Sequence, residues 1–340
     1  MRVSFFAIAL TILSLQTQNA AAWNAAGHRL SALIAWQQLD EETRTQVNRL
    51  LGKHPDHARW LARSKGDDPA MTAFVEASTW PDEIKSDRRF FDSGDGTPTP
   101  VLPGYTDMAR HRNWHYLDRP LGHHSAAAPP KGELETRLNA LAARLGNEGL
   151  AEAERAYALP WLIHLLADAH QPLHVVSRYD ANGHGDEGGN LLSIENPFHP
   201  RHSSTNLHSY WDDLPGPPWL RGERLASAAQ AIMAEHPQPP APGGTAHWIE
   251  ESFRVARERA YPVSEDVVPT LTADFHARAQ ASTRERLAAA GWRLAALLQE
   301  LLTARSQHRT DRVSRETGQA PLTDTKEQSM RRSKETAPLK

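Results

Sequence analysis

The feature that most constrains this chain is the spacing of its apolar residues, which recur every three or four positions through most of the sequence. This spacing places apolar side chains on one face of a helix, whereas a half-buried strand needs strict alternation. The clearest case is AAGHRLSALIAWQQL at 25–39, and similar spacing covers EETRTQVNRLLG and segments near 133–147, 150–170, 222–235, 247–260 and 270–305. We therefore predict an all-α fold, with a short hairpin near GGNLLSI as the one alternative to helix and loop.

Polar loops separate the predicted helices. Segments 92–110, 119–132 and 177–206 are rich in Gly, Pro, Ser, Asp and His, and loops of that length in a compact domain often carry function. After about Ser306 the chain is polar and charged and has little apolar surface to bury. We predict one helical domain over residues 23–305 and a disordered polar tail over 306–340.

The N-terminus, MRVSFFAIALTILSLQTQNAAAW, has the features of a secretory signal peptide. Arg2 precedes an apolar run that ends near Leu15, and Ala20 and Ala22 form an A-x-A cleavage pattern. The run is too short to span a bilayer. We predict a signal peptide over residues 1–22, whose removal makes Trp23 the first residue of a secreted or periplasmic monomer without a membrane anchor.

The absence of cysteine excludes one simple source of stability, and the negative net charge excludes one simple source of binding. The chain contains no cysteine, so disulfides do not stabilise it. Its formal net charge is −3, which offers no general attraction to nucleic acid or to an anionic membrane. Any attraction for phosphate must therefore be local.

The stretch HLLADAHQPLH, residues 164–174, concentrates side chains that bind metal ions. On a helix, His164 and Asp168 stand four residues apart and share one face. Pro172 cannot continue that helix, so the chain turns and can bring His174 back beside the pair. His170 faces another direction and is a weaker candidate. A His-x₃-Asp pair alone is more often an ordinary side-chain contact than a pair of ligands.

Further pieces of the sequence add to the same pattern. In NLHSYWDD, His208 and Asp212 repeat the four-residue spacing. TWPDEI contains Asp82, and HRNWHYLD contains His115. Taken alone, Asp82 would be interpreted as a helix cap and His115 as a histidine of the core. Imidazole nitrogen and carboxylate oxygen suit Zn²⁺, and a site without thiolate favours catalytic over structural zinc.

Taken in order, these motifs resemble the S1/P1 nuclease family. The resemblance spans roughly residues 23–215, and the later helices up to about 305 fit the family's all-α, single-domain bundle of the phospholipase C/P1 nuclease type with long functional loops. The segments that carry it are WNAAGH with Trp23 and His28, WPDEI, WHYLD, HLLADAHQPLH, GGN at 188–190 and NLHSYWDD.

The resemblance implies a cluster of three zinc ions. The amine and carbonyl of Trp23 would bind one ion together with His28, and Asp168 would bridge it to a second. The implied ligands of the second ion are Asp82, His115 and His164, and those of the third are His174, His208 and Asp212. Because a free amine titrates near 8, removal of the signal peptide becomes part of making the site.

The charges of such a cluster suit phosphate chemistry. Three Zn²⁺ ions and three aspartates leave about +3 in the pocket of an acidic protein. A zinc pair lowers the pKa of a shared water and a third ion can hold the phosphate, as hydrolysis of a phosphodiester requires. The resemblance thus implies a zinc-dependent endonuclease that cuts single-stranded DNA and RNA to 5′-phosphorylated products and can also act on 3′-nucleotides.

Three more residues match substrate positions of the family. Tyr116 stands where an aromatic ring stacks on a base, although a tyrosine there can also be a core ring, and Asp118 stands where a carboxylate binds the base edge. Stacking of this kind recognises unpaired bases. Lys85 stands where many relatives carry an arginine near the scissile phosphate, and lysine supplies charge without a bidentate fork.

The chain also departs from parts of the family pattern. It lacks the disulfides of fungal and plant relatives, so the metals would supply much of that stabilisation. The loop after Asp118 does not reproduce an Asp and Lys found in some fungal members, and we assign no general base there. The remaining histidines of this region are expected at the surface or in supporting roles: His111, His123, His124, His170, His184, His199 and His202.

Two alternatives come from other classes of protein. A trinuclear zinc phospholipase C also begins with a metal-binding Trp, but its first His lies further from that residue and its last ligand is Glu rather than Asp212. A zinc-binding interaction protein would use the cluster only to hold the fold, and it would leave no coordination position open to water.

Overall fold

The computed structural model describes residues 23–317, apart from 67, 93–97, 123–129, 200–202, 238–239, 242 and 265. The predicted signal peptide lies outside the described residues, as do residues 318–340 of the predicted tail and His123, His124 and His202.

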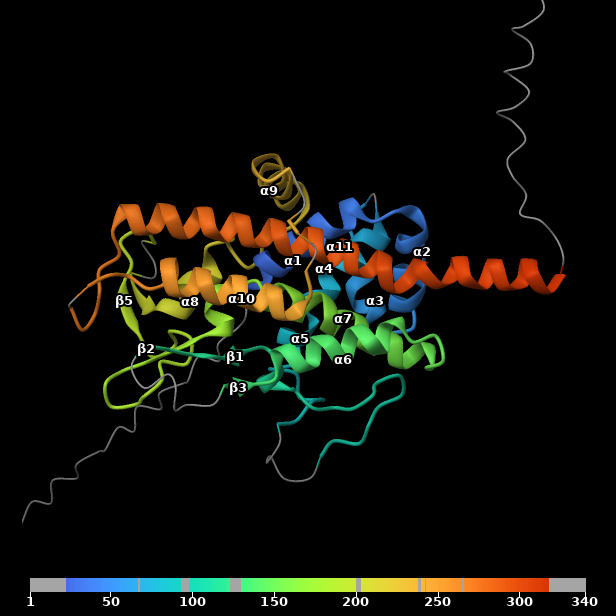
Figure 1. The fold of residues 1–340 in the computed structure, drawn as a ribbon, viewed down its shortest axis with the longest axis horizontal. Coiled ribbons are helices and arrows are strands. Elements are labelled where there is room, and N and C mark those ends of the chain that lie inside the picture. The colour runs from blue at the N-terminus through green and yellow to red at the C-terminus, as the bar shows by residue number, and fades with distance from the viewer. Residues whose placement is uncertain are drawn as a thin grey trace, which may run out of the picture.

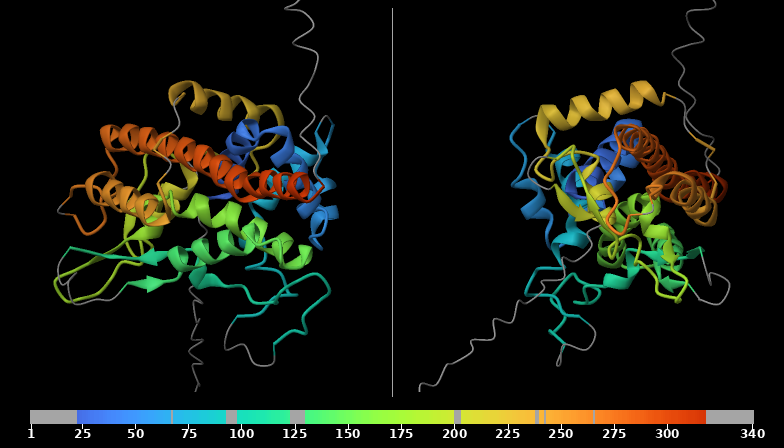
Figure 2. Two further views of the ribbon diagram at one scale, coloured as in Figure 1. Left: turned by 45° about the vertical axis from the view of Figure 1, so that its right-hand side comes forward. Right: turned by 90° about the vertical axis from the view of Figure 1, so that its left-hand side faces the viewer.

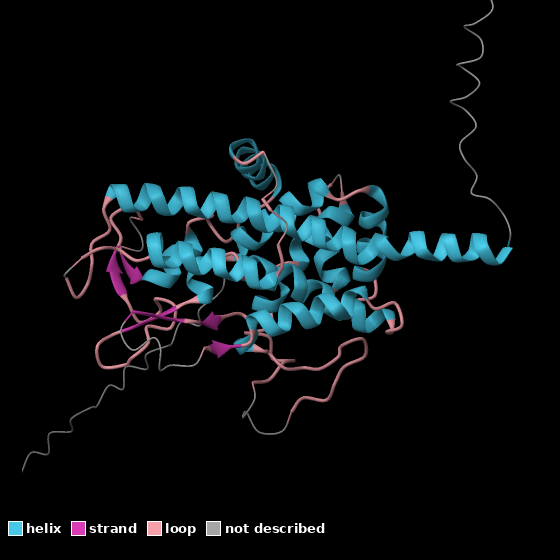
Figure 3. Cartoon of the chain, viewed as in Figure 1, coloured by secondary structure: helices cyan, strands magenta, loops and turns pink. Residues whose placement is uncertain are grey.

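The described chain is mostly helical, which confirms the predicted fold class (Figures 1 and 3). The α-helices are α1 (Ala25–Gln38), α2 (Glu41–Leu51), α3 (His57–Leu61), α4 (Pro69–Ala77), α5 (Trp80–Glu83), α6 (Leu134–Gly146), α7 (Glu152–Asp168), α8 (Leu207–Asp213), α9 (Gly222–Glu235), α10 (Thr245–Val255) and α11 (Ala273–Thr317). Three short helical turns accompany them: η1 (Arg112–Trp114), η2 (Pro172–Val175) and the π-helical η3 (Ala256–Ala260).

Within the described residues, short strands form three separate two-stranded pairs. β1 (Leu117–Asp118) is antiparallel to β3 (Lys131–Gly132), β2 (Pro120–Gly122) is parallel to β4 (Ser177–Tyr179), and β5 (Ser193–Glu195) is antiparallel to β6 (Ser204–Asn206). The pair of β5 and β6 begins in GGNLLSI, the segment for which a short hairpin was the alternative to helix and loop.

The core lies between helices that are far apart in sequence. α1 runs beside α11, and α7 packs between α1, α2 and α6 (Figure 2). The α1–α11 contact is close because α11 carries Gly291 there, where a Cβ atom would clash with the side chain of Ile34. α7 is buried from Arg155 to Asp168. The central helix therefore presents its C-terminal end, with His164 and Asp168, inside the protein.

Polar residues fix where several helices begin. The side chain of Asn24 accepts a hydrogen bond from the Ala26 amide at the start of α1, and Asp40 does the same for Thr43 at the start of α2. Asn206 caps α8 through Ser209. Such caps satisfy amides that have no partner within the helix, and here they fix α1 and α8, which carry His28 and His208.

The predicted tail boundary differs from the structure. α11 continues to Thr317, so the helix includes the first twelve residues that we assigned to a disordered tail, 306–317. The segment contains several arginines and neither glycine nor proline. A long helix that already exists adds such residues at little cost.

None of the helices within the described ranges is both long enough and apolar enough to span a membrane.

Candidate metal centre

The end of α7 creates the centre of the site. His164 and Asp168 lie one helical turn apart and are both fully buried. After the helix ends, Pro172 begins η2, and this turn carries His174 back into the interior. Local sequence thus positions three of the predicted ligands before any distant segment contributes.

Three groups of predicted ligand side chains assemble around this turn. In each group the candidate ligand atoms lie within 4.8 Å of one another. The groups are His28, His164 and Asp168; Asp82, His115 and His164; and His174, His208 and Asp212. The helix α1, the short helix α5, the turn after η1, α7, η2 and α8 each contribute to them.

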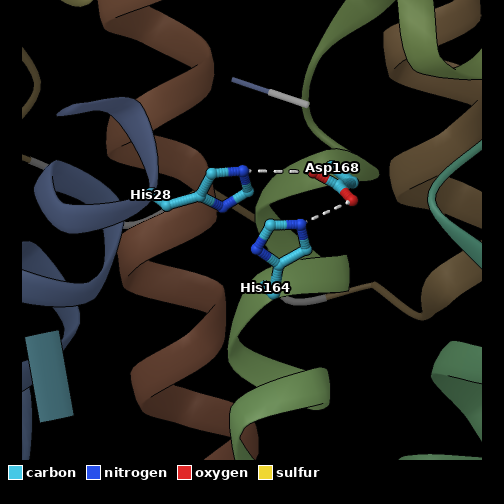
Figure 4. A group of neighbouring side chains, drawn as sticks. All are labelled: His28, His164 and Asp168. Atoms are coloured by element: carbon cyan, nitrogen blue, oxygen red, sulfur yellow. Dashed lines mark ion pairs between the residues drawn. The ribbon is translucent and has the colours of Figure 1, made fainter. Parts of the chain in front are cut away.

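Asp168 faces His28 with one carboxylate oxygen and His164 with the other (Figure 4). Its Oδ1 is 3.4 Å from His28 Nε2, while its Oδ2 is 3.1 Å from His115 Nδ1 and 3.3 Å from His164 Nε2. The two oxygens of one carboxylate thus face ligands of different groups. This arrangement allows Asp168 to bridge two metal ions.

Backbone carbonyls hold three of the histidine rings. The Nδ1 atoms of His164, His174 and His208 contact the carbonyl oxygens of Ser78, His115 and Gly188 at 2.7, 2.7 and 2.8 Å. Since a carbonyl only accepts, Nδ1 must carry the proton in each ring. Nε2 is left with its lone pair directed into the site, which is how metal-binding histidines are commonly oriented.

Burial keeps most of these imidazoles neutral. It lowers the pKa of His28 and His115 well below the usual value, and neighbouring positive groups lower it further. Burial also lowers the pKa of His174, and it lowers that of His208 to about 4. A neutral imidazole has the free lone pair that a metal ion needs.

The third group depends on a residue that the sequence analysis missed. Gln171 donates a hydrogen bond from Nε2 to Asp212 Oδ1 at 2.8 Å, and its own Oε1 accepts from the Leu173 amide. Asp212 Oδ2 remains near His208 Nε2, at 3.5 Å. Gln171 therefore selects which oxygen of Asp212 faces the group. Its position between the predicted ligands Asp168 and His174 was the available signal.

Several buried polar atoms in this cluster have no hydrogen-bond partner. They include both ring nitrogens of His28, Nε2 of His115 and Oδ1 of Asp168. In addition, His164 Nε2 and His115 Nδ1 lie 3.0 Å apart, as do His208 Nε2 and His174 Nε2 at 3.1 Å. Buried donors and acceptors are rarely left unpaired. Two ring nitrogens whose lone pairs face each other also repel. The residues thus fit metal ions, and nitrogen with carboxylate oxygen suits zinc.

Trp23 lies next to this cluster. It is completely buried, and the following amide of Asn24 donates to the carbonyl oxygen of Asp212 at 3.1 Å. The Asn24 side chain also donates to Asp213 Oδ1 and to the Gly216 carbonyl. These contacts tie the predicted mature N-terminus to the end of α8 and keep Trp23 beside a predicted ligand.

A cleft of about 470 Å³ opens onto the cluster. His115, His174 and His208 line its inner part, and the predicted substrate residues Lys85, Tyr116 and Asp118 line it as well. Its remaining lining includes Arg112, Lys131 and Glu187, which the sequence analysis missed, although Arg112 lies in HRNWHYLD and Glu187 directly precedes GGN. The volume is in the range of small-molecule sites.

Lys85 is paired with a candidate ligand. The Nζ atom of Lys85 forms an ion pair with Asp82 Oδ1 at 2.6 Å, although the angles do not meet those of a hydrogen bond. The Lys85 side chain is 9% exposed. The structure places this charge at the cleft and next to the cluster, one turn beyond Asp82.

The other described histidines do not join the three groups. His170 contacts the Leu166 carbonyl through Nδ1 and Arg293 through Nε2, so it supports the packing of α7 against α11. His111 stacks on Trp114 and contacts Asp107. Both therefore have the supporting roles expected for them.

A helical bundle in which His and Asp side chains form three adjoining groups that could hold metal ions, below an open cleft, has the residues that a metal-dependent hydrolase needs. A profile described as S1/P1 Nuclease matches residues 23–303. The chain therefore belongs to the S1/P1 nuclease family and is a phosphodiester hydrolase.

Two plant proteins are similar to this chain. Endonuclease 4 of Arabidopsis thaliana is 26% identical over 326 residues, which cover 87% of this chain and 95% of the relative. Endonuclease 3 of the same plant is 26% identical over 216 residues, covering 61% of this chain and 59% of the relative.

Proposed function

We propose that this nuclease is an exported, zinc-dependent endonuclease that hydrolyses single-stranded DNA and RNA to 5′-phosphorylated products and also removes phosphate from 3′-nucleotides. The observation that carries the proposal is the joining of the three His/Asp groups to one cleft that also contains Tyr116 and Asp118. Phosphate chemistry and base recognition can thus take place in the same cavity.

Each group of residues has a defined task in this proposal. The His and Asp side chains of the three groups would hold the ions, with Asp168 shared between two of them. Zinc, when bound, supplies positive charge for the phosphate and lowers the pKa of a water. Lys85 adds positive charge at the cleft, and Asp82 keeps its ammonium oriented toward the cluster.

The substrate would be held by its base as well as by its phosphate. The ring of Tyr116 can stack on an unpaired base, and Asp118 can accept hydrogen bonds from the base edge. A base inside a duplex is stacked and paired and cannot enter such a cleft without being flipped out. This preference for accessible bases is the physical basis for proposing single strands.

The N-terminal sequence supports export. The buried position of Trp23 supports a mature protein that begins at this residue. N-terminal sequencing of the protein recovered from the periplasm or medium tests this: we expect Trp23, and a first residue elsewhere would contradict it.

The cleft lining does not favour the phospholipase alternative. Apart from Leu173, the residues that line it are charged, polar or aromatic with a hydroxyl group, whereas acyl chains require a largely apolar surface. The test uses purified zinc-loaded protein with single-stranded DNA, single-stranded RNA, duplex DNA and phosphatidylcholine vesicles. We expect hydrolysis of the single strands first. Hydrolysis of phosphatidylcholine alone would overturn the proposal.

A further inference from the structure

The part of the cleft lined by Tyr116, Asp118 and Lys131 presents a defined set of hydrogen-bonding groups. β1 and β3 pair Asp118 directly with Lys131, and directly paired residues of neighbouring strands project to the same side. Both side chains line the cleft, together with Tyr116. An acceptor and a donor are therefore side by side next to a ring on which a base can stack.

Glu187 adds a second acceptor to the cleft. It lies in the left-handed region with φ +52, which is uncommon for a residue other than glycine. The Ser177 hydroxyl accepts a hydrogen bond from its amide at 3.1 Å, and its side chain lines the cleft. Strained backbone of this kind persists where the surroundings over-determine it, often at binding sites.

The electrostatics show that these groups act on one another. Burial, with a further contribution from Glu187, raises the pKa of Asp118 to about 7, and Lys131 opposes the shift. The two carboxylates and the ammonium thus belong to one local arrangement.

This arrangement complements one base better than the others. The pairing edge of guanine offers one acceptor, O6, and two neighbouring donors, N1–H and the N2 amino group. Adenine and cytosine offer one donor group each on that edge, and uracil and thymine offer a single N–H between two carbonyls. Ionised carboxylates only accept and an ammonium only donates, so the set with both carboxylates ionised matches guanine.

We propose that Glu187 and Lys131 are specificity-determining residues that make this cleft select guanine in unpaired strands. In this arrangement Lys131 donates to O6 while Asp118 and Glu187 accept from N1–H and the N2 amino group. The inference rests on the proposed function, because the base must enter the cleft beside the metal groups.

Binding of nucleotides tests the assignment without relying on turnover. The affinities of 5′-GMP, 5′-AMP, 5′-CMP and 5′-UMP are measured by calorimetry on zinc-loaded protein. We expect 5′-GMP to bind about tenfold more tightly than the other three, as one well-placed pair of hydrogen bonds discriminates between bases. Equal affinities, or tighter binding of another base, would overturn the inference.

Two substitutions assign the preference to residues. In Lys131→Met the affinity for 5′-GMP should fall about tenfold, while that for 5′-AMP changes less than twofold. In Glu187→Gln the amide can both donate and accept, so the affinities for 5′-GMP and 5′-AMP should approach each other. A guanine preference that survives both substitutions would contradict the assignment.

Matched controls carry the same chemical changes far from the cleft. Lys53 is 54% exposed near Glu152, and Glu285 is 53% exposed near Arg259. Lys53→Met and Glu285→Gln should leave all four affinities unchanged, and zinc content and circular dichroism verify that every variant is folded.

Hydrolysis of a single-stranded RNA by the wild-type protein separates the guanine preference from the proposed nuclease function. If the RNA is cut without guanine preference, only the inference fails; if no single strand is cut, the proposed function fails.

Discussion

His28 and His164 lie face to face, with ring centroids 3.8 Å apart and an interplanar angle of 9°, although they belong to the separate helices α1 and α7. Each ring reaches a different oxygen of Asp168. Two stacked imidazolium ions would repel each other in a buried site. The stacking therefore joins the two helices in a geometry that opposes protonation of both rings at once.

Removal of the metal ions should destabilise the protein. The ligands extend along the chain from α1 to α8, and a metal that binds only the folded state adds its binding free energy to stability. We expect the melting temperature to fall by about 10 °C after zinc is removed with EDTA. Calorimetry with measured zinc content checks this, and an unchanged melting curve in zinc-free protein would contradict it.

Residues added in front of Trp23 should disrupt the centre. Trp23 is completely buried, and Asn24 ties it to α8. A protein that begins with Gly-Ser before Trp23 would lose the free amine at this position, so we expect less bound zinc and a large loss of hydrolysis. The matched control begins at Trp23. Full zinc content and normal turnover in the extended protein would refute the role of the N-terminus.

Gly132→Ala should damage the part of the cleft that Tyr116 lines. Gly132 has φ +85, and a Cβ atom there would clash with the backbone oxygen of Tyr116. We expect a loss of about 1–2 kcal/mol in stability and a rise in KM for single-stranded oligonucleotides that exceeds the fall in kcat. Gly66→Ala is the control, because nothing lies within 4 Å of that position. Similar kinetics in both variants would argue against a role for Tyr116.

The protein should lose stability in acid through His54. Burial lowers its pKa to about 3, so His54 is neutral in the folded protein and binds a proton only after unfolding. Its contribution is therefore complete above pH 6.5 and is lost as the pH falls toward 3, by about 1.4 kcal/mol per pH unit. The measurement is the free energy of unfolding against pH.

Two variants isolate the contribution of His54. In His54→Asn the side-chain oxygen can still accept a hydrogen bond from the Asp56 amide, as His54 Nδ1 does now. This variant should be less stable, but its free energy of unfolding should depend less steeply on pH. His184→Asn alters a side chain that is 82% exposed and should leave the slope as it is. Equal slopes in the two variants would show that His54 stays accessible to protons.

The sequence predicted those parts of the site that depend on local spacing. His164 and Asp168 share a face of α7, and Pro172 turns the chain so that His174 re-enters the interior. Lys131 and Glu187 could not be predicted, because they meet Asp118 only through strand pairing and an unusual backbone conformation. The helical extension of α11 was not predicted, because its polar residues show no apolar periodicity. The helix α3 was not predicted either, because it is too short to show such a periodicity.

The central claim, that Asp168 joins two metal groups into one catalytic centre, is tested most directly by steady-state hydrolysis of a defined single-stranded oligonucleotide by Asp168→Asn, with zinc content determined. The substitution keeps the shape of the side chain and removes its charge. We expect kcat to fall by orders of magnitude with loss of bound zinc, whereas Asp118→Asn should change KM and base preference more than kcat. If Asp168→Asn retained full zinc and near-normal kcat, the bridging role of Asp168 would be contradicted.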